Sequence, residues 1–211
     1  MSTFTGIPAA AIAFYAELED NNNREWWLAH KDVYDSSVKE PLSLLLAELE
    51  DQFGPAKIFR PNRDIRFSAD KSPYKTAQGA FAATKEGTGF YVQLSAEGLL
   101  IGGGCHSHSP AQINRFRAAV DAPVSGEALQ HIVEAVAAAG FAIEGEKLKT
   151  VPRGFDKDHP RAELLKHKSL SAGIELGEPD WLSTSDARKE IAARWEQLRP
   201  LVEWMSEHAA P

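Results

Sequence analysis

The sequence predicts an α+β protein: an antiparallel β-sheet, formed by a meander plus returning strands, is covered by helices, and both termini are helical. Three observations support this prediction. Apolar residues recur at the three- and four-residue spacing of amphipathic helices before residue 54 and after residue 183. Between these blocks, short β-branched or aromatic segments are separated by "KEGT" and "AEG", glycine-containing connections of hairpin length. Helical and extended blocks in this order are typical of α+β folds.

The N-terminal block is expected to form three helices. An apolar stripe over residues 7–18 predicts the first, and "DNNN" at 20–23 both ends it and caps the next. A longer helix is expected from Lys31 to Phe53, with Gly54 as its C-cap. Pro41 implies a kink or a break in that helix, because proline lacks the N–H that an interior helical position donates.

The central block is expected to be a meander followed by two helices. Ser109 and Gln112 predict a capping box for a helix that reaches about Val120. Ser125 is the expected cap of the next helix, which Gly140 ends. The three segments expected to be strands of the meander are 79–84, 89–95 and 99–105.

The C-terminal third mixes both kinds of structure. Residues 141–152 are expected to form a hairpin, 159–167 a short helix, and 169–177 a strand that returns to the sheet. A last amphipathic helix follows, and Pro200 is expected to bend it.

Length and composition suit one domain, residues 1–211, because 211 residues can enclose one sizeable core. No apolar run approaches the roughly 20 residues of a membrane-spanning helix, and the N-terminus lacks the basic region of a signal peptide. The only cysteine, Cys105, excludes an internal disulfide and a four-thiolate zinc site. We therefore expect a cytoplasmic protein with no membrane partner, no metal and no cofactor.

Positive charge is concentrated in two stretches of an acidic chain. Residues 57–75 hold six Lys/Arg and two Asp, and residues 147–168 hold seven Lys/Arg and three Asp/Glu, so each carries +4. Subtracting both from the net charge of −7 leaves −15 on the remainder. This balance argues against a broad nucleic-acid-binding face, because the long-range field repels phosphates. It is compatible with a focused positive pocket.

The first stretch, "KIFRPNRDIRFSADKSPYK", combines the donors that recognise anions. Arginine offers a planar fork that matches phosphate or carboxylate, lysine a mobile charge, and tyrosine a neutral donor. Pro73 favours an extended Ser72 and so a structured turn. We expect the partner to be an anionic small molecule or a phosphorylated ligand. The candidate anion-binding residues of this stretch are Arg60, Arg63, Arg66, Lys71, Tyr74 and Lys75.

The second stretch is expected to add Arg153 and Lys157 to the same pocket. If the protein is an enzyme, Asp64 and His159 are the candidate general acid and base, although "PRGFDKDHP" also has the pattern of a tight turn into a helix. The alternative to a binding pocket is a structural or protein-interaction module. In such a module the same arginines form internal ion pairs with the acidic remainder.

Two other patterns have alternative interpretations. The glycines of "GGGCHSH", before a helix start, could cradle an anion or could permit a bulge or close packing. Cys105, His106 and His108 form one compact cluster, which is a ligand short of a zinc site.

Of Trp26 and Trp27, at least one ring is expected to anchor the N-terminal helices in the core.

The spacing from Arg60 to Tyr74 resembles the R-x-x-R-D-x-R-F-x-x-D-K-x-x-Y signature of a bacterial family, domain of unknown function 2461. The stretches "NNNREWW", "GGG" and "KTVPRGFDKDHP" are similar to further parts of that family's pattern, so the resemblance covers nearly the whole chain. It implies no particular activity. It does imply that the basic stretch is a family-wide pattern, which favours a ligand over surface ion pairs, because such pairs rarely need one fixed spacing.

Overall fold

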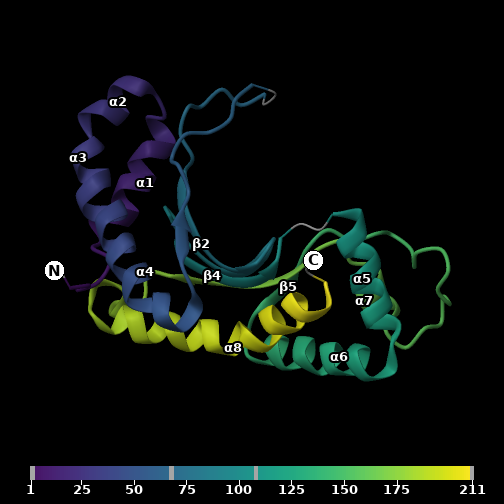
Figure 1. Cartoon of the computed structure of the whole chain (residues 1–211). Helices are drawn as coiled ribbons and strands as arrows, with labels where there is room; N and C mark the ends of the chain where they lie inside the picture. The colour runs from purple at the N-terminus through teal and green to yellow at the C-terminus, as the bar shows by residue number, and fades with distance from the viewer. Residues whose placement is uncertain (1–2, 67–68, 107–108, 210–211) are drawn as a thin grey trace. The chain divides into compact units, whose positions relative to one another are not determined.

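The computed structural model describes residues 3–66, 69–106 and 109–209 (Figure 1). Its helices are α1 (Ala10–Asp20), α2 (Arg24–Ala29), α3 (Lys31–Val33), the π-helix η1 (Tyr34–Lys39), α4 (Glu40–Phe53), α5 (Pro110–Asp121), α6 (Pro123–Ala138), α7 (Ala162–Leu165), the 3₁₀-helix η2 (Asp180–Ser183) and α8 (Asp186–His208). Its strands are β1 (Ala56–Ile58), β2 (Ala77–Lys85), β3 (Thr88–Ser95), β4 (Gly98–Cys105), β5 (Ala142–Glu144) and β6 (Leu170–Gly177).

The six strands form one antiparallel sheet in the order β1-β2-β3-β4-β6-β5. The consecutive strands β2, β3 and β4 are neighbours, as the predicted meander requires, and β6 is the returning strand. At the two edges, Lys57 of β1 is opposite Phe81 of β2, and Glu144 of β5 is opposite Ser171 of β6. The predicted α+β class is confirmed.

The chain forms two compact units. Unit 1 comprises Met1–Ala82, Tyr91–Ile101 and Glu175–Ala193, and unit 2 comprises Ala83–Phe90, Gly102–Ile174 and Arg194–Pro211. The single domain expected over residues 1–211 stays a prediction.

The core of unit 1 contains an aromatic cluster. The Trp27 side chain is 5% exposed, and its ring lies 5.6 Å from that of Phe14 and 4.9 Å from that of Tyr34. Trp27 therefore anchors α2 in the core, which confirms that one of the two adjacent tryptophans does so. The other, Trp26, is partly exposed and stacks on His30.

The local signals of the N-terminal helices act as the sequence indicates. The Asn23 side chain caps α2 by accepting the N–H of Trp26 at 3.0 Å, and Gly54 ends α4 with a φ of +87°. The predicted Lys31–Phe53 helix is a run of α3, η1 and α4, and the break expected at Pro41 is a π-helical segment before it. A wider π turn accommodates a proline ring that would clash with a carbonyl in a regular helix.

In unit 2, one of the two predicted helix caps is present. Ser109 and Gln112 form the expected capping box of α5. The predicted cap Ser125 is wrong, because α6 already begins at Pro123, and the Ser125 hydroxyl instead donates to the carbonyl of Ala119 at 2.6 Å. Proline at the first position starts this helix without a side-chain cap.

The hairpin expected over residues 141–152 is also wrong. Residues 142–144 form β5, which pairs with β6, and Lys147 bridges to His167. Residues 142–144 are extended, as the pattern indicates, but the residues with which this segment pairs lie some 20 to 30 positions further along the chain. Gly145 permits the close approach, since a Cβ at this position would lie 2.1 Å from the carbonyl oxygen of Ser169.

The glycine run at the end of β4 is a packing device. A Cβ on Gly103 would lie 3.2 to 3.3 Å from side-chain atoms of Val202 and Leu198 on α8. Gly104 has a φ of +124°, and a Cβ there would lie 2.6 Å from the carbonyl oxygen of Leu170. This geometry supports close packing as the role of these glycines.

We predict that Gly104→Ala lowers the free energy of unfolding by about 3 kcal/mol or more, because it combines a strained φ with a backbone clash. The matched control is Gly154→Ala, at a φ of +95° with no atom within 4 Å of the added Cβ. It should cost only about 1–2 kcal/mol, from φ alone. Chemical denaturation of both variants measures the difference, and equal costs would show that β4 is not closely packed at Gly104.

Candidate anion-binding site

The predicted basic stretch lies mainly in the loop that connects β1 to β2 in unit 1. The loop folds back on itself: the N–H of Arg63 donates to the carbonyl of Pro73 at 2.9 Å, and that of Lys75 to Pro61 at 2.8 Å. An isolated antiparallel bridge joins Asn62 to Tyr74 between these bonds. Figure 1 shows the loop, in blue, extending past the end of β2. It is a two-armed segment with a defined backbone at its base.

Tyr74 attaches this loop to the N-terminal helices. The side-chain amide of Asn22 donates to the Tyr74 carbonyl at 3.0 Å and accepts the Tyr74 N–H at 3.1 Å. The Tyr74 ring stacks on Trp27, with centroids 4.1 Å apart and planes at 10°, and is 7% exposed. We call these contacts among Asn22, Trp27 and Tyr74 the Tyr74 clamp. Tyr74 is thus a structural anchor of the loop.

At the tip of the loop, residues 63–71, two arginines pair with the two aspartates. Arg63 pairs with Asp70, and Arg66 pairs with Asp64 at 2.7 Å. The Arg66 side chain is 76% exposed, so its pair lies in solvent and contributes little to stability. Hydrogen bonds from Arg66 hold the pKa of the Asp64 carboxyl below its usual range, so this group stays ionised and is poorly suited to act as a general acid.

Lys71 also serves the tip. Its ammonium group donates to the carbonyl of Ile65 at 3.0 Å, across the two arms. Three of the predicted anion-binding side chains, Arg63, Arg66 and Lys71, therefore already have partners inside the loop.

The base of the loop borders a pocket of about 690 Å³ in unit 1. Two of the predicted residues, Arg60 and Lys75, line it, and three further lysines join them: Lys31, Lys39 and Lys57. Within the described part of the chain, only Lys31 of these five cations has an ion pair, with Asp35, the one acidic residue of the lining. The lining residues are Trp27, Lys31, Tyr34, Asp35, Lys39, Lys57, Ile58, Phe59, Arg60, Pro61, Asn62 and Lys75.

The π-helix η1 forms one wall of this pocket. Tyr34, Asp35 and Lys39 belong to it, and π-helical turns occur frequently at functional sites. The Tyr34 hydroxyl donates to the Gln78 side chain at 2.7 Å, and the Gln78 amide donates to the carbonyl of Phe59 at 2.7 Å. Burial, with the charge of Asp35, raises the pKa of Tyr34 to about 12, so the phenol remains a neutral donor. Gln78 thereby joins the helical wall to the loop.

A spacing in the sequence could have indicated Lys31 and Lys39, the two lysines that the helical wall contributes to the pocket. Lys31, Asp35 and Lys39 recur every four residues, which places them on one side of a helical segment. Lys57 had no such signal beyond its place in the basic stretch, because its position depends on the pairing of β1 with β2.

The second basic stretch lies in unit 2, and its central residues are structural. Arg161, 8% exposed, donates to the carbonyls of Val120 at 2.7 Å and Asp121 at 3.0 Å, so it caps the C-terminus of α5. His159 accepts the N–H of Arg161 at its Nδ1, while its Nε2 lies 3.3 Å from the Asp121 carboxylate. With both ring nitrogens engaged, His159 fits a turn into a helix better than proton transfer.

Arg153 and Lys157 are exposed and form no ion pair among the residues that the structure describes. They belong to unit 2, whereas Arg60 and Lys75 belong to unit 1. A pocket that combines the two stretches stays a prediction.

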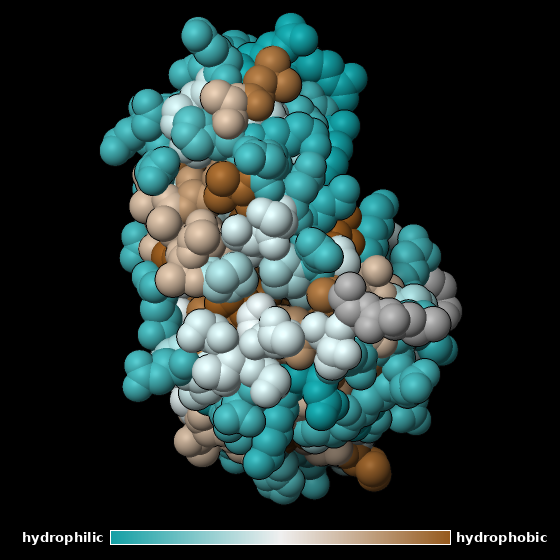
Figure 2. Space-filling view, turned by 90° about the vertical axis from the view of Figure 1, so that its left-hand side faces the viewer, coloured by the Kyte–Doolittle hydropathy of each residue, from teal (hydrophilic) through white to brown (hydrophobic). Residues whose placement is uncertain are grey.

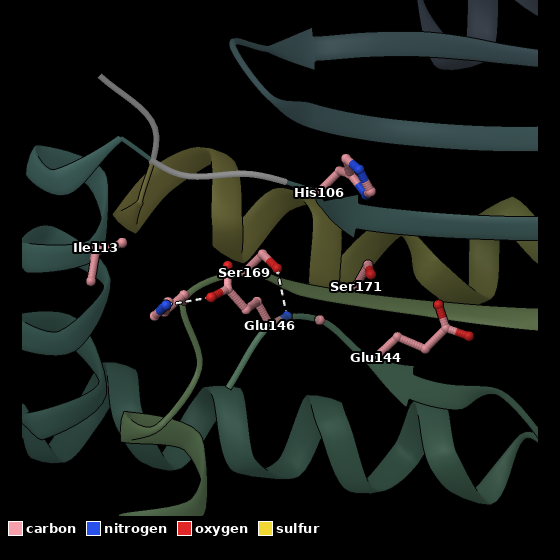
Figure 3. Close-up of a pocket in the computed structure, with 8 residues that line it drawn as sticks. His106, Ile113, Glu144, Glu146, Ser169 and Ser171 are labelled. Atoms are coloured by element: carbon pink, nitrogen blue, oxygen red, sulfur yellow. Dashed lines mark hydrogen bonds and ion pairs between the residues drawn. The ribbon is translucent and has the colours of Figure 1, made fainter. Parts of the chain in front are cut away.

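Unit 2 has a smaller pocket of about 390 Å³ with a different charge (Figure 3). Two glutamates, Glu144 and Glu146, line it with His106 and Lys168, and Lys168 pairs with Glu146. Figure 3 shows this ion pair and the hydrogen bond from the Glu146 N–H to the Ser169 hydroxyl, which is 2.9 Å long. This pocket lacks the excess of positive charge that an anion requires.

The described residues give less support to a metal site or a membrane-spanning helix. Along the described ranges, no group of three or more His, Cys, Asp or Glu side chains is placed to hold a metal, and the candidate His108 lies outside these ranges. None of the helices there has the length and apolar content needed to cross a bilayer. In the upper part of Figure 2, hydrophilic side chains predominate and hydrophobic ones form small separate areas.

The sheet order and its helices define an α+β protein, and unit 1 carries a basic pocket. The sequence pattern of the family described as "Conserved hypothetical protein (DUF2461)" matches residues 10–204, and the chain belongs to this family. No curated protein matches the chain. The Tyr74 clamp joins "NNNREWW" to the basic stretch, two of the segments on which the family resemblance rests.

We predict that Tyr34→Phe lowers the free energy of unfolding by about 1–3 kcal/mol, because the buried side-chain oxygen of Gln78 loses its donor. The matched control is Tyr91→Phe, which removes a hydroxyl bonded to Gln93 at a part-buried position, whereas Tyr34 is 4% exposed. Denaturant titration should show a smaller loss for the control. Equal losses would mean that the Tyr34–Gln78 bond contributes no more than the part-buried Tyr91–Gln93 bond.

We also predict a pH dependence from His167, which is 2% exposed and bonded through Nδ1 to the Ser169 carbonyl. Burial lowers its pKa below the ordinary value of 6.5. The unfolded chain therefore binds this proton at a higher pH than the folded protein does. The contribution of neutral His167 to the free energy of unfolding is complete above pH 6.5, and it is lost as the pH falls from 6.5 to the folded pKa. The slope from this one group is at most about 1.4 kcal/mol per pH unit.

Denaturation at several pH values tests this prediction through the difference between variants. His167→Gln should flatten the profile below pH 6.5, whereas His131→Gln, at an exposed position of α6, should keep the slope of the unmodified protein. Identical profiles for all three proteins would contradict the prediction.

Proposed function

We propose that the protein binds an anionic ligand with a phosphate-type group in the unit 1 pocket. The observation that carries this proposal is the charge of the lining: five Lys/Arg side chains face one Asp. Of the five, Lys39, Lys57, Arg60 and Lys75 form no ion pair within the described residues. The proposal concerns binding and assigns no reaction.

Electrostatics explains why such an arrangement favours a ligand. Like charges that share a pocket repel one another, which is unfavourable unless an anion enters and is shared among them. Lysines of the helical wall can close on such an anion from one side, and the Arg60 fork can bind it from the other. The Tyr34 hydroxyl lies in the same lining, but it donates its hydrogen to the Gln78 side chain.

The alternative is a structural or protein-interaction module whose basic residues form internal ion pairs. Two arginines do pair internally, Arg63 with Asp70 and Arg66 with Asp64. These pairs lie at the exposed tip of the loop, whereas the cations at its base, Lys57, Arg60 and Lys75, form no ion pair among the described residues. This division favours binding for the base of the loop and a structural role for its tip.

Part of the proposal concerns where the protein acts. We propose a cytoplasmic, bacterial binding protein, because the only cysteine suits a reducing compartment and the resembled family is bacterial.

Thermal unfolding with pyrophosphate tests the proposal. At 100 times its dissociation constant the ligand should stabilise the protein by about 2.7 kcal/mol. The variant Lys39→Gln/Arg60→Gln removes one cation from each wall and should lose most of this shift.

The matched control is Arg66→Gln/Lys71→Gln. It also removes one arginine and one lysine charge, but from the tip of the loop, and it should keep the stabilisation by pyrophosphate. Inorganic phosphate and sulfate serve as smaller anions. If pyrophosphate does not stabilise the unmodified protein, or if both variants lose the shift equally, the pocket is not the binding site.

A further inference from the structure

The unit 1 pocket has an apolar wall as well as a charged one. Ile58, Phe59 and Pro61 line it beside the cations. Phe59 is 36% exposed and is one of three large hydrophobic side chains exposed among the residues that the structure describes. A pocket for a bare inorganic anion does not require an exposed aromatic ring. We infer that the ligand is a nucleoside polyphosphate, whose base packs on the Phe59 wall; this inference rests on the proposed function.

The charge of the lining favours a polyphosphate over a single phosphate. A phosphate monoester carries about −1.5 to −2 near neutral pH. It would leave roughly half of the four cations that form no ion pair, Lys39, Lys57, Arg60 and Lys75, without a counter-charge. A di- or triphosphate chain carries enough negative charge to reach cations on both the helical wall and the loop.

The surroundings of Phe59 suit a flat base. The Lys75 ammonium lies over the ring, 5.6 Å from its centroid, and the Tyr91 ring lies 6.3 Å away, tilted by 32°. Lys75 therefore lies next to both the ring and the other cations, as a group that joins base and phosphate recognition would. Bases stack on aromatic side chains with little dependence on their sequence identity.

The size of the pocket is consistent with this ligand class. A volume of about 690 Å³ falls within the roughly 300–1,000 Å³ of sites that hold small organic ligands. The Gln78 amide bonds the Phe59 carbonyl and, through its oxygen, the Tyr34 hydroxyl. These bonds link the Phe59 carbonyl to the helical wall, which limits the movement of the backbone that carries the ring.

Isothermal titration calorimetry with ATP, tripolyphosphate and adenosine, without divalent cations, tests the inference. In the unmodified protein ATP should bind at least about tenfold more tightly than tripolyphosphate, a typical gain from stacking one base. Phe59→Leu keeps an apolar side chain but removes the flat ring. It should remove most of this tenfold difference, because it weakens ATP binding more than tripolyphosphate binding.

The matched control is Leu28→Ala, which alters another exposed hydrophobic residue of unit 1, 60% exposed and outside the pocket lining. It should change neither dissociation constant. Thermal unfolding of each variant establishes that it is folded before binding is compared.

The outcomes separate this inference from the proposed function. If tripolyphosphate binds as tightly as ATP, or if Phe59→Leu weakens both equally, the nucleoside assignment is wrong while anion binding stands. If neither binds, both fail. A thymidine octanucleotide that binds more tightly than ATP would assign the pocket to single-stranded nucleic acid and would overturn the nucleoside polyphosphate.

Discussion

The geometry of the candidate site depends on the Tyr74 clamp. The Asn22 amide makes the same pair of backbone hydrogen bonds with Tyr74 that a neighbouring strand would make, and the Tyr74 ring stacks on the buried Trp27. A surface loop of this length would otherwise sample many positions, because ordering each residue costs about 1–2 kcal/mol of conformational entropy. The clamp removes that freedom at the base of the loop. It thereby places loop cations and helix cations around one pocket.

The distribution of carboxylates gives the two ends of the loop different roles. Asp64 and Asp70 lie at the tip and pair with the nearest arginines, which leaves one positive charge there, that of Lys71. The pocket at the base has only Asp35 against five cations. Salt screens charges more than about 8–10 Å apart, so the distant part of the acidic remainder cancels little of this excess. An acidic protein can therefore hold a local positive site, and net charge alone does not describe it.

Features that depend on near neighbours were predictable. The capping box of Ser109 and Gln112, the Asn23 cap and the Gly54 terminator each involve residues within four positions of one another. The errors involve distant partners. Residues 142–144 carry a strand pattern, but the strand they pair with starts at Leu170, and this choice decides against a local hairpin. Ser125 had the chemistry of a cap, yet the helix begins earlier because Pro123 already provides a helical φ.

By itself, the sequence determined the α+β class, the family and the presence of a basic, turn-forming stretch with its two aspartates. It also contained the local ion pair at the tip, since Asp64 and Arg66 are two residues apart. Only the tertiary structure decided which cations meet. Lys39 of the helical wall and Arg60 of the loop are brought together by contacts between residues 52 positions apart, Asn22 and Tyr74. Such a contact depends on the packing of aromatic rings in the core, which no periodicity or spacing in the chain encodes.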